Sequence, residues 1–123
     1  MKKAFAWVTA AASLAASASC AGTMAPRAPV VTPSGVRFVL SQPQARSVAV
    51  AGSFNQWSPS SHPLAREGSR GIWMAVVALP PGEHLFMYVV DGTEWLSPPL
   101  AEDYVDDGFG ARNGVVVLPP RER

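Results

Sequence analysis

Short apolar runs, in which every second residue is hydrophobic, recur through the last two thirds of the sequence between glycine and proline turns. The clearest run is His84 to Val90, where Phe86, Tyr88 and Val90 fall on one side. A period of two is typical of a β-strand with one buried face, and no segment after residue 20 shows the period of an amphipathic helix. The chain is therefore expected to build its core from β-sheets.

Further strands are expected at 36–40, 46–51, 72–79, 93–96 and 113–118. The strand over 72–79 places Trp73 on its core-facing side. Pro80-Pro81-Gly82 predicts a turn, and Asp91-Gly92 predicts a hairpin. Six or seven short strands at regular spacing predict an all-β sandwich, and about 85 residues suffice for its core.

The first twenty residues have the composition of an export signal. A positive head that ends in Lys2 and Lys3 precedes an uncharged apolar stretch from Ala4 to Ala18. This stretch is too short to span a bilayer comfortably as a helix. We therefore expect the protein to be exported to the cell envelope, facing the periplasm or the exterior.

Cys20, the single cysteine of the chain, ends the segment L-A-A-S-A-S-C that begins at Leu14. The segment resembles a bacterial lipoprotein signal, in which the cysteine becomes the lipidated first residue. The resemblance implies a membrane anchor on Cys20, since acyl chains gain about 0.8 kcal/mol per buried methylene. Simple cleavage after Ala18 or Ala21 is the alternative.

Composition then divides the chain into four parts. Residues 1–20 are the expected signal, and residues 21–34 hold three prolines without apolar periodicity, which predicts a linker. Residues 35–119 are the expected sandwich, and residues 120–123 are a charged tail.

The charge balance argues against a nucleic-acid partner. Both lysines lie in the signal, so eight scattered arginines face nine acidic residues after Cys20, a net charge of −1. Phosphate binding requires a positive patch, and none is evident. The balance favours a neutral ligand.

The sequence also lacks the patterns of a catalytic or metal centre. There is no nucleophile elbow and no partnered cysteine, and His62 and His84 have no second ligand at a suitable spacing. Four acids cluster without the spacing of a calcium loop: Glu102, Asp103, Asp106 and Asp107. We expect no enzyme activity, no metal and no cofactor.

The segment from Val48 to Trp57 joins a strand to a turn with an aromatic end. Its alternation stops at Gly52, and Phe54 is expected to fold back toward the core. Trp57 then follows two polar turn residues, where a large apolar ring has no obvious core to enter. The ring is either a lid on the sandwich or a binding platform.

Six sequence elements, in order, resemble the glycogen-binding early-set modules, which are family 48 of the carbohydrate-binding modules. The elements are V-A-V-A-G-S-F-N-Q-W from Val48, G-I-W from Gly71, L-P-P-G-E-H from Leu79, Y-V-V-D-G from Tyr88, Trp95, and G-A-R-N-G-V-V-V from Gly110. Such modules occur in the β subunit of AMP-activated protein kinase and beside the catalytic domains of branching and isoamylase-type debranching enzymes. The resemblance implies an immunoglobulin-like, early-set sandwich that binds α-glucans without catalysis.

The resemblance also implies four carbohydrate-binding residues. Trp57 and Trp95 match the family's two stacking tryptophans, Asn113 matches an asparagine that hydrogen-bonds sugar hydroxyls, and Phe109 matches an apolar wedge. For Asn113 the alternative is a cap on the turn before the last strand. Two positions depart from the animal kinase module, since Met87 replaces a lysine and Ala111 replaces a threonine.

Three functions follow from these observations. The preferred one is an exported module, tethered through Cys20, that stacks α-glucan rings on Trp57 and Trp95. The second is an envelope immunoglobulin-like module that uses the same face for a protein partner, since fold alone does not settle function. The third is a structural lipoprotein without a ligand.

Overall fold

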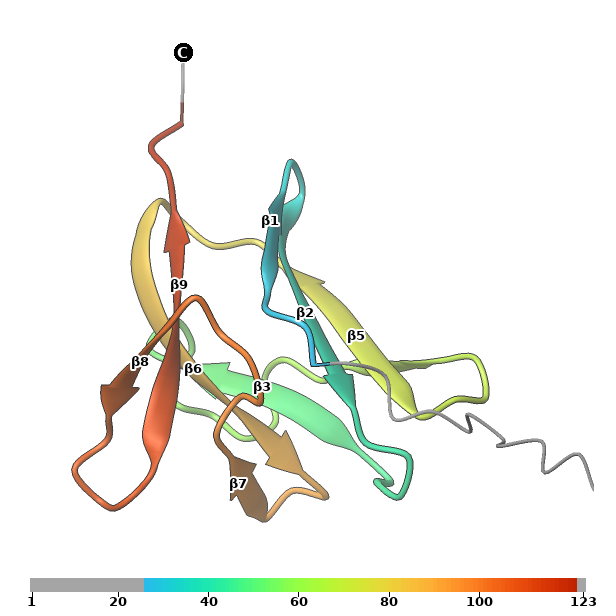
Figure 1. The fold of residues 1–123 in the computed structure, drawn as a ribbon. Coiled ribbons are helices and arrows are strands. Elements are labelled where there is room, and N and C mark those ends of the chain that lie inside the picture. Colours follow the sequence, from blue (N-terminus) through green and yellow to red (C-terminus); the bar gives the residue numbers. More distant parts are fainter. Residues whose placement is uncertain (1–25, 122–123) are drawn as a thin grey trace, which may run out of the picture.

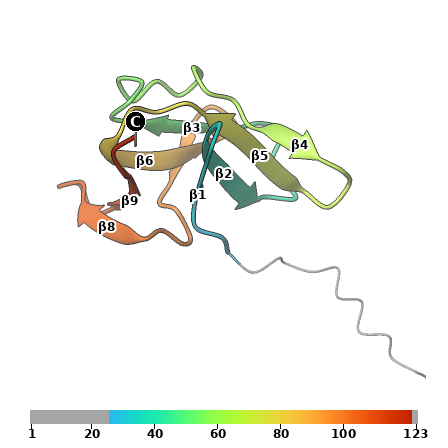
Figure 2. The same cartoon turned by 90° about the horizontal axis from the view of Figure 1, so that it is seen from above.

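Two antiparallel β-sheets face each other in the computed structural model, which describes residues 26–121 (Figures 1 and 2). The strands are β1 Val30–Thr32, β2 Gly35–Ser41, β3 Val48–Gly52, β4 Ala65–Glu67, β5 Ile72–Val77, β6 Gly82–Val90, β7 Glu94–Leu96, β8 Asp103–Asp106 and β9 Arg112–Leu118. Residues 26–121 contain no helix, and so none that could cross a membrane. The predicted all-β sandwich is confirmed.

The order of the strands places β6 at the centre of the larger sheet. One sheet has the order β1-β2-β5-β4, and the other has the order β3-β6-β9-β8 with β7 also paired to β6. β9 pairs with the first half of β6, up to Phe86, and β7 pairs with its last three residues. β3 occupies the other edge of β6, so three strands pair with this one strand.

Aromatic rings fill the space between the sheets. Phe38 of β2 contacts Phe86 and Tyr88 of β6 edge-on, with ring centroids 5.1 and 6.5 Å apart, and stacks on Phe54 at 6.0 Å. Burial raises the pKa of the Tyr88 hydroxyl, which donates a hydrogen bond to the Val39 carbonyl. The predicted inward direction of Phe54 is confirmed, and Phe86, Tyr88 and Val90, which were predicted to share one side of β6, all belong to the core.

Trp73 belongs to the core, as predicted, with 6% of its surface exposed. Its indole Nε1 donates to the Gln42 carbonyl at 3.0 Å. The Arg66 guanidinium lies over the ring at 4.7 Å and donates to the Ala45 carbonyl. This tryptophan is therefore a structural contact between β5 and the loop after β2.

Three segments that were not expected to be strands form them, so the sandwich has nine strands rather than about seven. β1 lies in the predicted 21–34 linker, β4 lies between the strands expected at 46–51 and 72–79, and β8 lies among the four clustered acids. Each has only three or four residues, too few for a period of two to stand out. They are held by pairing with β2, β5 and β9, longer strands that supply the ladder partners.

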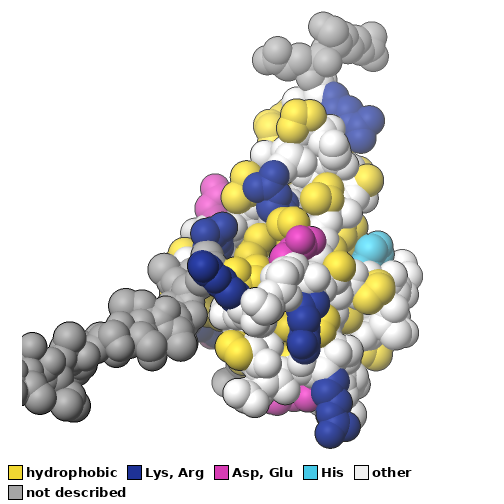
Figure 3. All heavy atoms as spheres, turned by 90° about the vertical axis from the view of Figure 1, so that its right-hand side faces the viewer, with side chains coloured by type: hydrophobic (Ala, Val, Ile, Leu, Met, Phe, Trp, Pro, Cys, Tyr) yellow, Lys and Arg dark blue, Asp and Glu magenta, His cyan; other side chains and the backbone are white. Residues whose placement is uncertain are grey.

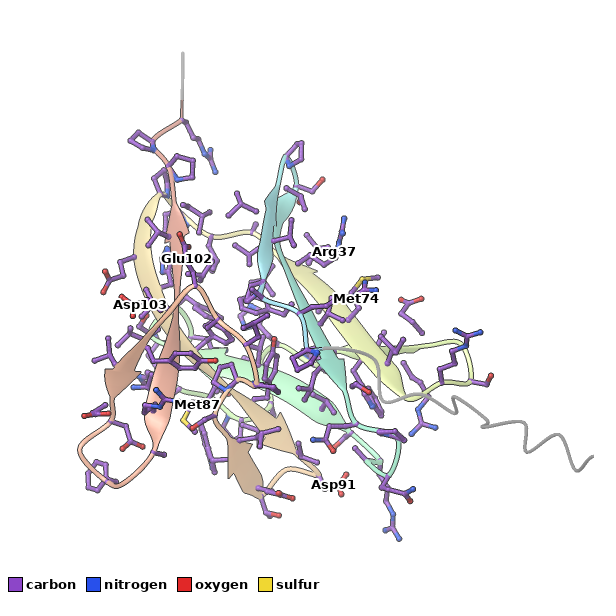
Figure 4. The ribbon with its side chains drawn as sticks, viewed as in Figure 1. Arg37, Met74, Met87, Asp91, Glu102 and Asp103 are labelled. Carbon is purple, nitrogen blue, oxygen red and sulfur yellow. The ribbon has the colours of Figure 1, made fainter. Side chains whose placement is uncertain are left out.

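The outer face of the smaller sheet mixes aliphatic and charged side chains. Val30, Arg37 and Val76 are direct neighbours across β1, β2 and β5. Arginines and hydrophobic side chains are interspersed on this side of the molecule (Figure 3), and Arg37 and Met74 mark it in Figure 4. The outward rows of these described strands contain no aromatic residue, which distinguishes this face from that of the larger sheet.

Gly52 is expected to tolerate no side chain. A Cβ at this position would overlap the Leu85 carbonyl oxygen of β6 and the Phe54 ring. Gly52→Ala should lower the free energy of unfolding by about 3 kcal/mol, at the upper end of overpacking effects, as measured by urea denaturation.

Gly68→Asn is the matched control for this prediction. Nothing lies within 4 Å of a Cβ at Gly68, and asparagine tolerates its φ of +64°. The free energy of unfolding of the control should lie within about 0.5 kcal/mol of that of the unmutated protein. An equally small effect of Gly52→Ala would contradict the close contact between β3 and β6.

Candidate functional site

The outer face of the larger sheet carries the residues singled out from the sequence. Residues directly opposite each other in paired strands point to the same side, so Ala49, Val89 and Trp95 form one outward row across β3, β6 and β7. Asn113 and Val105 form another across β9 and β8. The face is thus mainly apolar.

Met87 marks the point where β7 and β9 meet along β6. The ladder of β9 with β6 ends at Gly114 and Phe86, and that of β7 begins at Leu96 and Tyr88, so Met87 lies between the two. The amide of Arg112 donates to the Ser97 hydroxyl at 3.2 Å and ties the strand ends together. Met87 is only 5% exposed and is labelled in Figure 4.

Trp57 lies in the turn that directly follows β3, and its side chain is half-buried. Its amide donates to the Gly52 carbonyl at 3.0 Å, which closes the turn. Gln56 and Trp57 both have left-handed backbones, with φ of 57° and 58°. Because this conformation costs a non-glycine residue about 1–2 kcal/mol, other contacts must hold the turn.

The Asn55 side chain supplies those contacts, a role that the sequence analysis missed. Its Oδ1 accepts from the Gly52 amide at 3.0 Å. Its Nδ2 donates to the Val50 carbonyl at 3.1 Å and to His62 Nδ1 at 2.8 Å. An asparagine three residues after a strand-ending glycine is a recognisable signal for such a side-chain-closed turn.

Trp95 is presented by the hairpin between β6 and β7. Asp91 and Gly92 form its turn, with φ of 53° and 76°. The Asp91 carboxylate accepts hydrogen bonds from the amides of Arg46 at 2.7 Å and Ser47 at 3.1 Å, and these bonds lower its pKa. Trp95 keeps 43% of its surface exposed.

Phe109 lies in the turn between β8 and β9, and 93% of its surface is exposed. The Asp107 carboxylate accepts from the Phe109 amide at 2.7 Å and from the Ala111 amide at 3.1 Å. A ring with so little contact gains nothing for folding from its apolar area. Its exposure is what an apolar contact with a ligand or partner requires.

All four residues predicted to bind carbohydrate lie on the larger sheet or on turns next to its strands. Trp95 and Phe109 are exposed, Trp57 is half-buried, and Asn113 is 8% exposed. Their binding roles remain predictions. Val105, opposite Asn113 and 43% exposed, adds an apolar side chain to the face that the sequence analysis did not single out.

Residues 26–121 hold no group of three or more histidine, cysteine, aspartate or glutamate side chains that could bind a metal. His84 Nε2 donates to the Pro80 carbonyl at 2.8 Å, because a carbonyl oxygen only accepts, and His62 is hydrogen-bonded to Asn55. The described histidines are thus engaged in holding loops.

A family model for carbohydrate-binding module 48, the isoamylase N-terminal domain, matches residues 25–107. The chain is also similar to 1,4-alpha-glucan branching enzymes. It is 35% identical to that of Nitrosospira multiformis over 87 residues and 38% identical to that of Pseudomonas aeruginosa over 86 residues. These matches cover 71% and 69% of the chain but only 12% and 11% of the enzymes.

The Asp91 carboxylate should make folding stability depend on acid pH. Its folded-state pKa lies below the ordinary value of 3.8, so its stabilisation is present above that pH and is lost as the pH falls through the lowered pKa. Urea unfolding should show Asp91→Asn to be less stable than the unmutated protein at about pH 7, with the difference shrinking toward about pH 2. A difference that stays constant with pH would contradict this role.

Proposed function

The chain belongs to the carbohydrate-binding module 48 family, and from this premise we propose that it binds α-glucan without catalysing a reaction. The proposed binding surface is the outer face of the larger sheet, with Trp57 and Trp95 as stacking platforms. The observation that carries the proposal is the exposure of Trp95 and Phe109 beside an apolar sheet face. The branching reaction named for the relatives belongs to proteins of which this chain matches about a tenth.

The chemistry of the surface suits a neutral sugar. One face of a pyranose ring presents C–H groups, which pack flat against the amphipathic surface of an indole. Met87 and Val89 lie on the side of β6 that Trp95 faces, but they are only 5% and 1% exposed, so a ligand would meet mainly the more exposed rings. Recognition would therefore depend on ring shape more than on hydroxyl pattern.

Phe109 and Asn113 have secondary roles in this proposal. Phe109 would wedge against the ligand from the β8–β9 turn, and Asn113 would offer one amide with both donors and acceptors. Each stacking platform adds about 0.5–1.5 kcal/mol beyond area burial, by analogy with aromatic pairs. Two platforms suggest a dissociation constant on the order of 0.1–1 mM for a short oligosaccharide.

A protein-interaction module on the same face is the second candidate. Its support is that Val105, 43% exposed, joins Trp95 and Phe109 among the exposed apolar side chains of the larger sheet and its turns, because large exposed apolar side chains favour protein partners as well as sugars. Met87, where the kinase module has a lysine, removes a polar anchor for a sugar. Glucan binding separates the two candidates.

Affinity electrophoresis through gels with and without glycogen tests the glucan site. Glycogen should retard the unmutated protein, and Trp57→Ala and Trp95→Ala should each weaken that retardation by about tenfold in apparent affinity. Val76→Ala, on the opposite sheet and also at an exposed position, is the matched control and should migrate like the unmutated protein. Unretarded migration of the unmutated protein would exclude the glucan site and favour a protein partner.

We also propose that the module is exported and tethered to the cell envelope through a lipid on Cys20, which lies outside the described residues. The support is the sequence of the first twenty residues. Cells that express the protein should incorporate radioactive palmitate into it, and Cys20→Ala should abolish the label. Unchanged labelling of Cys20→Ala would refute lipidation at that residue.

A further inference from the structure

We infer that Asn55 and His62 are positioning residues, a hydrogen-bonded pair that sets the direction of the Trp57 ring. The inference deepens the proposed function and rests on it for its effect on binding. Neither side chain needs to touch a ligand, so the pair would act on binding only through Trp57. The contacts run from His62 through Asn55 and Gly52 to Trp57.

The Asn55 amide is fully committed inside the protein. Its oxygen accepts from Gly52, and its nitrogen donates to Val50 and His62, while only 7% of the residue is exposed. An amide nitrogen has two protons to donate, and both have acceptors here. The side chain therefore has one orientation that satisfies all its partners.

His62 is a fixed acceptor rather than a mobile loop residue. Its carbonyl accepts from the Val50 amide at 3.0 Å, and the Leu64 amide donates to Val48 at 2.8 Å, so the 62–64 segment runs along β3. Its ring meets Phe54 edge-on at 5.6 Å. Because an amide nitrogen only donates, His62 Nδ1 must accept, which places the ring proton of the neutral side chain on Nε2.

The pair acts on Trp57 through the backbone of the turn. Asn55 Oδ1 holds the Gly52 amide, and the carbonyl of the same Gly52 accepts from the Trp57 amide. Gln56 and Trp57 adopt left-handed backbones only as long as the turn is closed. Without Asn55 the turn can relax to ordinary backbone angles, which would change the direction in which the indole points.

Three variants of the full chain test the inference with maltoheptaose as the probe. Asn55→Ala removes the whole amide, and His62→Leu removes the acceptor together with the ring that meets Phe54. His62→Asn is the conservative control, because asparagine Oδ1 and histidine Nδ1 are both two bonds from Cβ, so the asparagine oxygen can accept the same hydrogen bond. Affinity is measured by titration at a temperature where circular dichroism shows each protein folded.

Asn55→Ala and His62→Leu should bind maltoheptaose about tenfold more weakly, because only a fraction of the molecules would present Trp57 correctly. His62→Asn should bind within about threefold of the unmutated protein. In ¹H–¹⁵N spectra the indole signal of Trp57 should shift or broaden in the first two variants, while that of the core residue Trp73 stays in place. A merely structural role would not move the affinity of folded molecules or this one indole signal.

Unchanged affinity and an unchanged Trp57 signal in folded Asn55→Ala would overturn the inference, as would His62→Asn behaving like His62→Leu. The indole signals separate this failure from that of the proposed function. If the unmutated protein binds no maltoheptaose but the Trp57 signal still moves in both disruptive variants, the glucan proposal fails and the positioning role stands.

Discussion

The contact of Phe38 with three other aromatic rings connects the core of the sandwich to the candidate site. Phe38 packs on Phe86 and Tyr88 of the central strand and on Phe54 in the turn after β3. Phe54 therefore extends the core into the same turn that carries Trp57. Ser53 fixes the turn from the other side, since its amide donates to the Leu85 carbonyl and its hydroxyl accepts from the Leu85 amide.

A second close contact shapes the sheet beneath the site. A Cβ at Gly114 would lie 2.8 Å from both the Phe86 ring and Pro98. Glycine at this position allows Phe86 and Pro98 to pack against β9, at the residue where its pairing with β6 ends. The outward side of that same point carries Met87 and, on β9, Asn113. The packing on the inner side of the larger sheet thus determines where β9 separates from β6 on its outer side.

The sequence was sufficient for features that depend on a repeated pattern. The strands β6 and β9, the inward direction of Phe54 and the core position of Trp73 were all predicted and are confirmed. β1, β4 and β8 were missed because three or four residues carry no period, and each is held by the longer strand that follows it directly in the chain. The bond between Asn55 and His62 was missed because it depends on the path of the loop between them.

The three turns next to the proposed binding face share one device. In each turn a side-chain oxygen accepts a hydrogen bond from a backbone amide, and the residues that supply it are Asn55, Asp91 and Asp107. They lie within four residues before Trp57, Trp95 and Phe109, respectively. These three polar side chains are thus used to hold the backbone. A ligand would meet mainly rings and aliphatic side chains, so its binding would depend on the spacing and direction of those rings. The turns that set these directions would then control affinity as much as the rings do.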